Sequence, residues 1–342
     1  MGAFKGTLTS LQACQTVAQV LALNGIPYAE LPSGDGGKGT LFGLWKACGG
    51  RVYTFKSRNP LDEPNQSEVL QLPDRSIFFE SASVCGLPAE RLSPMRASSR
   101  GLGELLTRIR RAFPDEKLRV VVGIGDTSTN DGGSGMLQAL GYKIPGGEGN
   151  GKTLSSILSL TPPEKDLLLG IELSIWCDVQ NSLTGAQGAA RVFAPQKGAS
   201  KEEVVELEAG FSHWKSLLAI KDDLHTGAGG GLAAAFRGAL NAPLVAGATT
   251  FLKAVSFSAR IPFHSHVFTG EGKTDSQTLK GKLVGEIVNQ VSLEPVQAVI
   301  FSGQVEEAAK TALHGLGAQT IAVGKEPSAE IALARGVEKY LG

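Results

Sequence analysis

Four glycine-rich segments of the sequence carry carboxylates beside hydroxyl groups and lysines, a combination suited to chemistry on phosphate. They read SGDGGKGT from residue 33, GDTSTNDGGSG from 125, CDVQNSLTGAQGAARVFAPQKGAS from 177 and TGEGKTDSQTLKGK from 269. In phosphoryl transfer, backbone amides and lysines balance the phosphate charge, carboxylates hold Mg²⁺, and one carboxylate can accept a hydroxyl proton. The four segments together therefore indicate phosphoryl transfer.

Each of these acidic residues also has a purely structural interpretation. Asp35 and Asp131 could be turn or helix-capping residues, because a short carboxylate readily accepts hydrogen bonds from nearby backbone amides. Asp178 follows an apolar run and could cap the next turn, and Glu271 and Asp275 could be solvated loop charges. The sequence leaves both interpretations open.

Residues 146–153 read GGEGNGKT and match the complete phosphate-binding P-loop pattern G-x-x-x-x-G-K-[ST]. A true P-loop follows a buried strand and opens a helix, and its lysine reaches the phosphates. Here Pro145 precedes the first glycine and no apolar strand comes before it. A surface turn is the favoured interpretation, and a P-loop NTPase that uses Lys152 is the alternative. His264 and His266 could share one face of a strand, but without a third ligand nearby a structural or surface role is favoured.

Strands and helices alternate along the chain, which predicts an α/β fold with a parallel sheet and functional loops at strand ends. The nearly continuous apolar run at 118–125 suits a strand that is covered on both faces. Apolar patterns and turn residues predict helices at 11–25, 41–50, 101–113, 200–220, 230–240 and 282–291, and strands at 26–32, 51–55, 67–72, 76–82, 118–125, 173–179, 266–272, 296–303 and 318–324.

At 342 residues the chain is long for one compact domain, so two α/β domains are expected. We expect a discontinuous Rossmann-like domain with a parallel sheet, built from residues 1–50 and 262–342. Residues 51–261 would form an inserted α/β domain, with the active site in the cleft between the two.

The composition argues against polyanionic partners. Lysine plus arginine equals aspartate plus glutamate at 33 each, so there is no overall field to attract nucleic acid or a membrane surface. Cys14, Cys48, Cys85 and Cys177 lie far apart, which is typical of reduced thiols. No apolar run approaches the roughly 20 residues of a membrane span, and no secretory leader is recognisable. A cytoplasmic location is expected.

Several motifs, taken together and in order, resemble those of the bacterial glycerate kinase family, which is neither P-loop nor ribokinase-like. They are FKGTLTS, GDGGKGT, FFESASVCGL, GIGDTSTNDGGSGMLQALG, CDVQNSLTGAQGAARVFAPQKGAS, GAGGGLAAA and TGEGKTDSQTLKGK. The resemblance implies ATP-dependent phosphorylation of D-glycerate, to 2-phosphoglycerate in most members, with Mg²⁺ and a two-domain α/β fold. Small-molecule substrates, D-glycerate and ATP, are the expected partners, and a homo-oligomer is left open.

On this resemblance we expect the following residues to form the site. Lys5, Ser83 and Asp178 would contact substrate or the transferring phosphoryl group, and Asp35 and Asp131 would serve Mg²⁺ binding or proton transfer. The residues expected to bind substrate or phosphate are Ser83, Thr129, Asn130, Asn181, Lys197, Glu271 and Asp275, and those expected to be catalytic are Lys5, Asp35, Asp131 and Asp178.

The sequence also departs from the family pattern. It begins MGAFKG, without the strand that usually precedes this segment, and Gly2 and Ala3 stand where the family has Asp and Ser. Asp126 replaces a glycine and Lys38 replaces a glutamate. These departures predict the loss of one ligand contact. They motivate an alternative in which the chain is a degenerate member that binds a small acid or a nucleotide without turnover.

Overall fold

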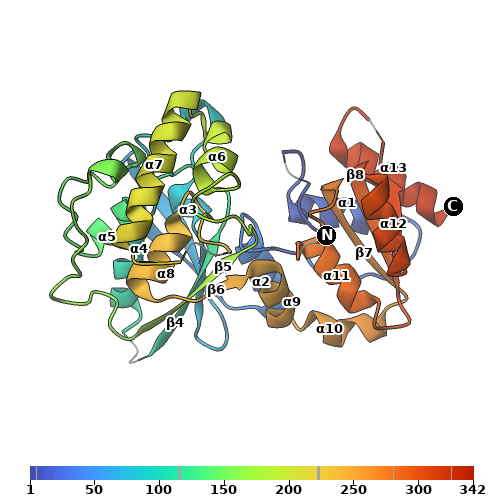
Figure 1. Cartoon of the computed structure of the whole chain (residues 1–342). Coiled ribbons are helices and arrows are strands. Elements are labelled where there is room, and N and C mark those ends of the chain that lie inside the picture. The colour runs from blue at the N-terminus through green and yellow to red at the C-terminus, as the bar shows by residue number, and fades with distance from the viewer. Residues whose placement is uncertain (5, 115–116, 222–223, 280, 325) are drawn as a thin grey trace. The chain divides into compact units, whose positions relative to one another are not determined.

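The computed structural model describes residues 1–342 except 5, 115–116, 222–223, 280 and 325 (Figure 1). The chain divides into two compact units. Unit 1 contains Met1–Asp35, Gly39–Gly49 and Ala246–Gly342, and unit 2 contains Gly36–Lys38 and Gly50–Val245. Residues 246–261 are expected in the inserted domain, but by their contacts they belong to unit 1. There, helix α9 (Gly247–Ala254) contacts α2 (Thr40–Cys48) and α11 (Leu283–Val291).

Unit 1 is built on a parallel sheet in the order β7-β8-β9. Its strands are β7 (His266–Thr274), β8 (Gln297–Val305) and β9 (Gln319–Ala322), and the helices α11 and α12 (Glu307–Gly315) connect them in turn. This β-α-β-α-β order is the Rossmann-like arrangement that the sequence predicts for the two chain ends. The short helix α10 (Phe257–Arg260) precedes β7.

Alternating residues of β8 divide between the two faces of this sheet, as the pleat of a strand requires. Val299 and Phe301 form a core cluster with α1 (Ser10–Leu23) and α13 (Ala329–Leu341), whereas Ala298 and Ile300 are buried on the opposite face. Helix α1 begins as predicted, because Thr9 and Gln12 form a capping box that binds the first free amides of the helix.

The predicted strand at residues 26–32 is wrong, since this segment has no regular secondary structure. Pro27 and Pro32 cannot donate to a strand ladder, because proline has no backbone N–H. The segment instead makes scattered contacts: the amino group of Met1 donates to the Leu31 carbonyl at 3.2 Å, and the Ile26 amide donates to the Leu21 carbonyl at 2.9 Å.

Unit 2 contains a mixed sheet in the order β1-β2-β3-β4-β5-β6. Strands β1 (Arg51–Arg58) and β2 (Pro64–Gln71) form an antiparallel hairpin, and β2 is antiparallel to β3 (Ile77–Glu80). Strand β4 (Leu118–Ile124) is parallel to β3 and also to β5 (Ile171–Cys177), and β6 is Leu244–Ala246. The strongly apolar segments thus form the parallel centre of the sheet.

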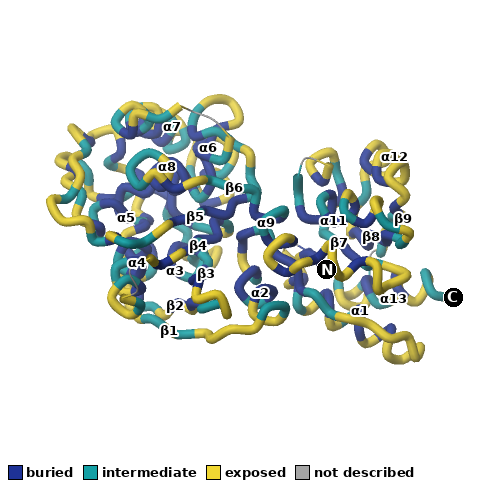
Figure 2. The backbone as a smooth tube through the Cα atoms, turned by 90° about the horizontal axis from the view of Figure 1, so that it is seen from below, coloured by how far each residue is buried: buried dark blue, intermediate teal, exposed yellow. Residues whose placement is uncertain are grey.

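One face of this sheet holds the main core of unit 2. Phe79, Val122 and Ile175 are fully buried there, while Phe78 and Trp176 lie on the other face with ring centroids 5.3 Å apart. Figure 2 shows buried tube along the central strands and a largely exposed β1. The helices of unit 2 are α3 (Ala82–Cys85), α4 (Arg100–Ala112), α5 (Ser134–Ala139), α6 (Ala189–Phe193), α7 (Lys201–Leu217) and α8 (Leu232–Leu240).

Two expectations from composition can be compared with the structure. All four cysteines carry free thiols, as predicted. Among the described residues, no helix has the length and apolar character needed to cross a membrane.

Candidate functional site

Three neighbouring parallel strands of unit 2 end at the same edge of its sheet, where ligands bind in open α/β sheets. Ser81 directly follows β3, the segment 125–135 follows β4, and Asp178 directly follows β5. The strands place these polar residues side by side, so this edge is the first place to look for a site.

Asp131 lies at the centre of the loop after β4 and is fully buried. One carboxylate oxygen accepts hydrogen bonds from the Ser99 amide (2.7 Å), the Ser99 hydroxyl (2.6 Å) and the Gly135 amide (3.2 Å), and the other accepts from the Gly133 amide (3.1 Å). Burial raises the pKa of Asp131, and these hydrogen bonds oppose the rise. Both oxygens are occupied, so the carboxylate organises the loop and does not fit a magnesium ion.

Lys197 reaches the same loop from the short 3₁₀ turn Pro195–Lys197 and is only 6% exposed. Its ammonium donates to the Thr129 carbonyl at 2.8 Å and lies 3.4 Å from the Thr127 hydroxyl. Burial lowers the pKa of Lys197 to about 8, although the charge of Asp131 opposes this. Lys197 therefore places a buried positive charge against the backbone of the loop.

Several buried side-chain atoms at this edge have no hydrogen-bond partner within the described part of the chain. They are the hydroxyls of Ser81, Thr129 and Ser134 and both polar atoms of the Asn130 amide. An unsatisfied buried polar group costs about 1–3 kcal/mol, so native proteins rarely leave such a group alone. These atoms are therefore placed to bind a polar ligand or ordered water.

Glycines bring a second loop very close to this one. The Gly132 amide donates to the Gly230 carbonyl at 3.1 Å, and a side chain on Gly230, which has φ +66, would collide with the Thr129 carbonyl. Asp126 also has a positive φ of 51°, a backbone conformation that aspartate tolerates better than most residues. Its carboxylate accepts a hydrogen bond from the Lys38 amide at 3.2 Å, which joins the segment Gly36–Lys38 to unit 2.

The other predicted residues of unit 2 serve the loops themselves. The Ser83 hydroxyl donates to the Glu80 carbonyl at 2.8 Å, and the Asn181 amide donates to the Gln187 carbonyl at 2.8 Å. Asp178 is half-buried at the end of β5. Lys5 lies outside the described residues.

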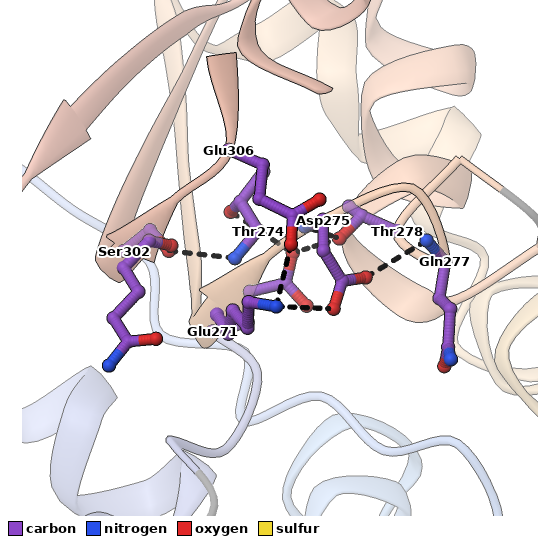
Figure 3. A network of polar contacts seen from close by, with 9 residues as sticks. Glu271, Thr274, Asp275, Gln277, Thr278, Ser302 and Glu306 are labelled. Atoms are coloured by element: carbon purple, nitrogen blue, oxygen red, sulfur yellow. Dashed lines mark hydrogen bonds and ion pairs between the residues drawn. The ribbon is translucent and has the colours of Figure 1, made fainter. Parts of the chain in front are cut away.

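Unit 1 carries its own polar network at the carboxyl end of β7 (Figure 3). Glu271 accepts hydrogen bonds at Oε1 from the hydroxyls of Thr278 (2.7 Å) and Thr274 (3.2 Å). Burial raises the pKa of Glu271, and these hydrogen bonds partly oppose the rise. Both threonines are fully buried, so Glu271 is held in a fixed orientation.

Asp275 occupies a different environment in the same network. Its carboxylate accepts a hydrogen bond from the Gln277 amide at 2.9 Å and pairs with Lys273 at 3.5 Å. Burial pushes the pKa of Asp275 upward, but the Gln277 hydrogen bond and the charges of Lys282 and Lys273 outweigh it and lower the pKa. Two nearby carboxylates therefore have pKa values shifted in opposite directions.

The predicted site residues thus fall into two groups. Thr129, Asn130, Asp131 and Lys197 meet in unit 2, and Asp178 is placed at the same strand edge. Glu271 and Asp275 meet in unit 1, and Asp35 also belongs to unit 1. In the described part of the chain, no group of three or more His, Cys, Asp or Glu residues could hold a metal ion.

The P-loop alternative lacks its structural context. Before residues 146–153, Lys143 makes only an isolated bridge to Thr161, and the segment continues into the 3₁₀ helix Gly151–Ser156 instead of an α-helix. Lys152 is exposed, and the Thr153 hydroxyl is hydrogen-bonded to the Glu148 amide at 2.8 Å. The segment is therefore a surface turn, as favoured from its sequence.

The histidine pair is also structural. His264 Nδ1 lies 2.9 Å from the Arg260 carbonyl, and the His266 ring packs edge-on against Phe268 and Tyr340.

Comparison with known proteins identifies the family of the chain. The model of the glycerate kinase family matches residues 1–340. The chain belongs to the glycerate kinase family. It is 32% identical over 334 residues to the glycerate kinase of Bacillus subtilis (strain 168), covering 92% of this chain and 87% of that protein. It is 36% identical over 282 residues to the glycerate 2-kinase of Escherichia coli (strain K12), covering 77% and 72%.

The fold agrees with this membership. A Salmonella typhimurium LT2 protein assigned as a glycerate kinase 2 matches with a TM-score of 0.73 and 28% sequence identity, covering 99% of this chain and 96% of that one. The family match extends over both units, which confirms the family, the kinase class and the mixed α/β architecture predicted from the sequence motifs.

Sequence reasoning missed the residues that position the predicted ones. Ser99 binds Asp131 from a segment 32 residues earlier, and no spacing rule connects the two. Thr274 and Thr278 follow Glu271 by three and seven residues in one motif, which is a signal that could have identified them as its partners.

Proposed function

We propose that this member of the glycerate kinase family transfers the γ-phosphoryl group of ATP to a hydroxyl of D-glycerate. The observation that carries the proposal is the family match over residues 1–340. The similarity to a relative named glycerate 2-kinase favours 2-phosphoglycerate as the product. ATP is the phosphate donor, and the free thiols of the chain are compatible with reaction in the cytoplasm.

The loop edge of unit 2 is the proposed anion-binding part of the machinery. The Lys197 ammonium, the Thr129 hydroxyl and the Asn130 amide bring positive charge and unsatisfied donors to one loop. Donors that are already fixed in place stabilise developing phosphate charge more effectively than mobile water does. Asp131, whose oxygens are both occupied, is proposed to position this loop.

A magnesium ion would supply charge neutralisation on the phosphates. Mg²⁺ keeps several of its waters and is held by one or two carboxylates together with substrate phosphates, so a complete protein cage is not needed. Asp131 does not fit this role because its oxygens accept four hydrogen bonds. Of the two carboxylates that the sequence predicts as magnesium ligands, Asp35 stays the predicted one.

Phosphorus NMR of a reaction with ATP, Mg²⁺ and D-glycerate tests the proposal, because it reports turnover and identifies the phosphorylated hydroxyl. ADP and 2-phosphoglycerate should appear together, and omission of D-glycerate should abolish both. Binding of glycerate or ATP without any ADP would establish the degenerate-member alternative instead. Lys152→Ala serves as the matched control: it should leave turnover unchanged, whereas a P-loop enzyme would lose it.

A further inference from the structure

Both polar atoms of the Asn130 side chain are unsatisfied at the strand edge of unit 2. The residue is fully buried, and neither its amide oxygen Oδ1 nor its amide nitrogen Nδ2 has a hydrogen-bond partner in the part of the chain that the structure describes. Buried polar side chains nearly always have a partner, so an amide with two unsatisfied atoms indicates a ligand. Exchanging the oxygen and the nitrogen of this amide would leave both atoms equally unsatisfied.

The other polar atoms at this edge are able to donate. The hydroxyls of Ser81, Thr129 and Ser134 are buried without partners in the described part of the chain, and each has one hydrogen to donate. The Lys197 ammonium has three hydrogens, and its acceptors among the described residues are the Thr129 carbonyl at 2.8 Å and the Thr127 hydroxyl at 3.4 Å. One hydrogen therefore remains for a ligand. This set of donors fits the oxygens of a carboxylate or phosphoryl group, which accept hydrogen bonds.

The oxygen of the Asn130 amide has the opposite requirement. An amide oxygen only accepts, so an anion that only accepts cannot satisfy it. The three edge hydroxyls do not satisfy it either, since none of them has a partner within the described residues. The ligand must therefore bring a hydrogen-bond donor as well as a negative charge. A hydroxy acid has both, because it carries a hydroxyl group beside a carboxylate.

The loop that carries Asn130 begins at the surface of unit 2. Asp126 is exposed and Thr127 is half-buried, whereas the residues that follow them in the loop are buried. The Lys197 ammonium lies between these two parts, because it contacts the Thr127 hydroxyl and the Thr129 carbonyl. Its charge is therefore placed where the loop leaves the surface, which suits the attraction of a small anion. All of these residues belong to unit 2.

We propose that Asn130 determines the acceptor specificity of this loop, a role that rests on the proposed kinase activity. Oδ1 accepts a hydrogen bond from a hydroxyl of D-glycerate, and Nδ2 donates to the carboxylate of the same molecule. Lys197 and the three edge hydroxyls bind the remaining anionic oxygens. An acid without a hydroxyl leaves Oδ1 buried and unpaired, and a site that is built to bind a hydroxyl rejects such an analogue.

Binding of D-glycerate and of propionate to the full chain tests the proposal, since propionate has the same carboxylate and no hydroxyl. Calorimetry should give the wild-type protein a preference of about tenfold or more for D-glycerate, the effect of one hydrogen bond to a buried acceptor. Asn130→Leu has a side chain of similar shape without polar atoms, so this preference should fall below about threefold. D-lactate and 3-hydroxypropionate each keep one hydroxyl and identify the one that Asn130 binds.

The stability of the protein without ligand provides a second measurement. Asn130 makes no hydrogen bond to the described residues that leucine would lose, so Asn130→Leu should melt at or above the wild-type temperature. Asn65→Leu is the matched contrast in unit 2. Its Nδ2 donates to the Ser83 carbonyl at 2.8 Å, so this substitution should lower the melting temperature by a few degrees. Asn65→Leu should also keep the preference for D-glycerate.

The outcomes separate this role from the proposed function. If wild-type protein neither binds D-glycerate nor forms ADP with it, the proposed function fails and this role fails with it. If wild-type protein phosphorylates D-glycerate but binds propionate equally well, the kinase assignment stands and the role of Asn130 is overturned. The role is also overturned if Asn130→Leu keeps the full preference, or if it melts as far below wild type as Asn65→Leu, which would indicate an amide that holds only ordered water. Should Asn130→Leu not fold, Asn130→Ala replaces it in the binding measurement with the same expected loss of preference.

Discussion

Replacing Lys197 with methionine removes a buried positive charge while keeping most of the side-chain volume. Burial lowers the pKa of Lys197 from 10.5 to about 8. Keeping Lys197 protonated in the folded protein therefore reduces the free energy of unfolding by about 3 kcal/mol. Methionine removes this cost but leaves the Thr129 carbonyl without its donor, at about 1–3 kcal/mol. The two terms nearly cancel, so the variant should be about as stable as wild type at pH 7.

The difference between the two proteins should then change with pH in a defined direction. Below pH 8 both the folded and the unfolded wild-type chains carry the lysine proton, and between pH 8 and 10.5 only the unfolded chain does. Wild-type stability should therefore rise relative to Lys197→Met by about 2 to 3 kcal/mol between pH 7 and pH 10. Other titrating groups are common to both proteins and cancel in the comparison.

Urea unfolding at several pH values measures this difference. Trp214 is a suitable reporter for unit 2, because it is fully buried and its indole donates to the Gly132 carbonyl at 2.8 Å. Lys152→Met is the matched control, since Lys152 is exposed and should give a curve parallel to wild type. If Lys197→Met and wild type differ by the same free energy at every pH, Lys197 does not carry a desolvated charge and the reasoning fails. Activity should also fall, because the loop that Lys197 holds loses its anchor.

Two further predictions concern the packing of unit 2. Asp131→Asn turns an amide N–H₂ toward backbone donors such as that of Gly133, so the free energy of unfolding should fall by about 2 kcal/mol, and an unchanged urea midpoint would contradict the buried network. Gly36→Ala should lower the melting temperature more than Gly185→Ala. Both glycines have a positive φ (98° and 94°), but only at Gly36 would the new Cβ lie 2.6 Å from a backbone atom, the Trp176 carbonyl. Equal melting temperatures for the two variants would exclude that close contact.

Local signals in the sequence were sufficient for most elements of the fold. The capping residues Thr9 and Ser200 begin helices α1 and α7, and the apolar run before Gly125 is the buried strand β4. These features depend on neighbouring residues, so they can be read from spacing and residue type. The strand predicted at residues 26–32 is wrong because a strand also needs a pairing partner along its length. The pattern of neighbouring residues does not show whether such a partner exists.

The candidate site was only partly accessible from sequence for the same reason. The glycine-rich loops and their acidic residues are visible as motifs. However, the Lys197–Thr129 hydrogen bond joins residues 68 positions apart, and the Ser99–Asp131 bond joins residues 32 apart. Asp131 is fully buried and accepts hydrogen bonds at both oxygens, a state that depends on these long-range bonds and cannot be predicted from its motif.

The division of the chain also has a consequence for biosynthesis. Helix α1 is made before Gly50–Val245. The β8 residue Phe301, with which Val17 and Val20 share a core, lies in the third segment of unit 1, which begins only at Ala246. A ribosome must therefore complete Gly50–Val245 while the apolar face of α1 remains exposed. Domains usually fold in the order of their synthesis. In this protein, unit 1 can close only after Gly50–Val245 has been made, although helix α1 precedes that segment in the chain.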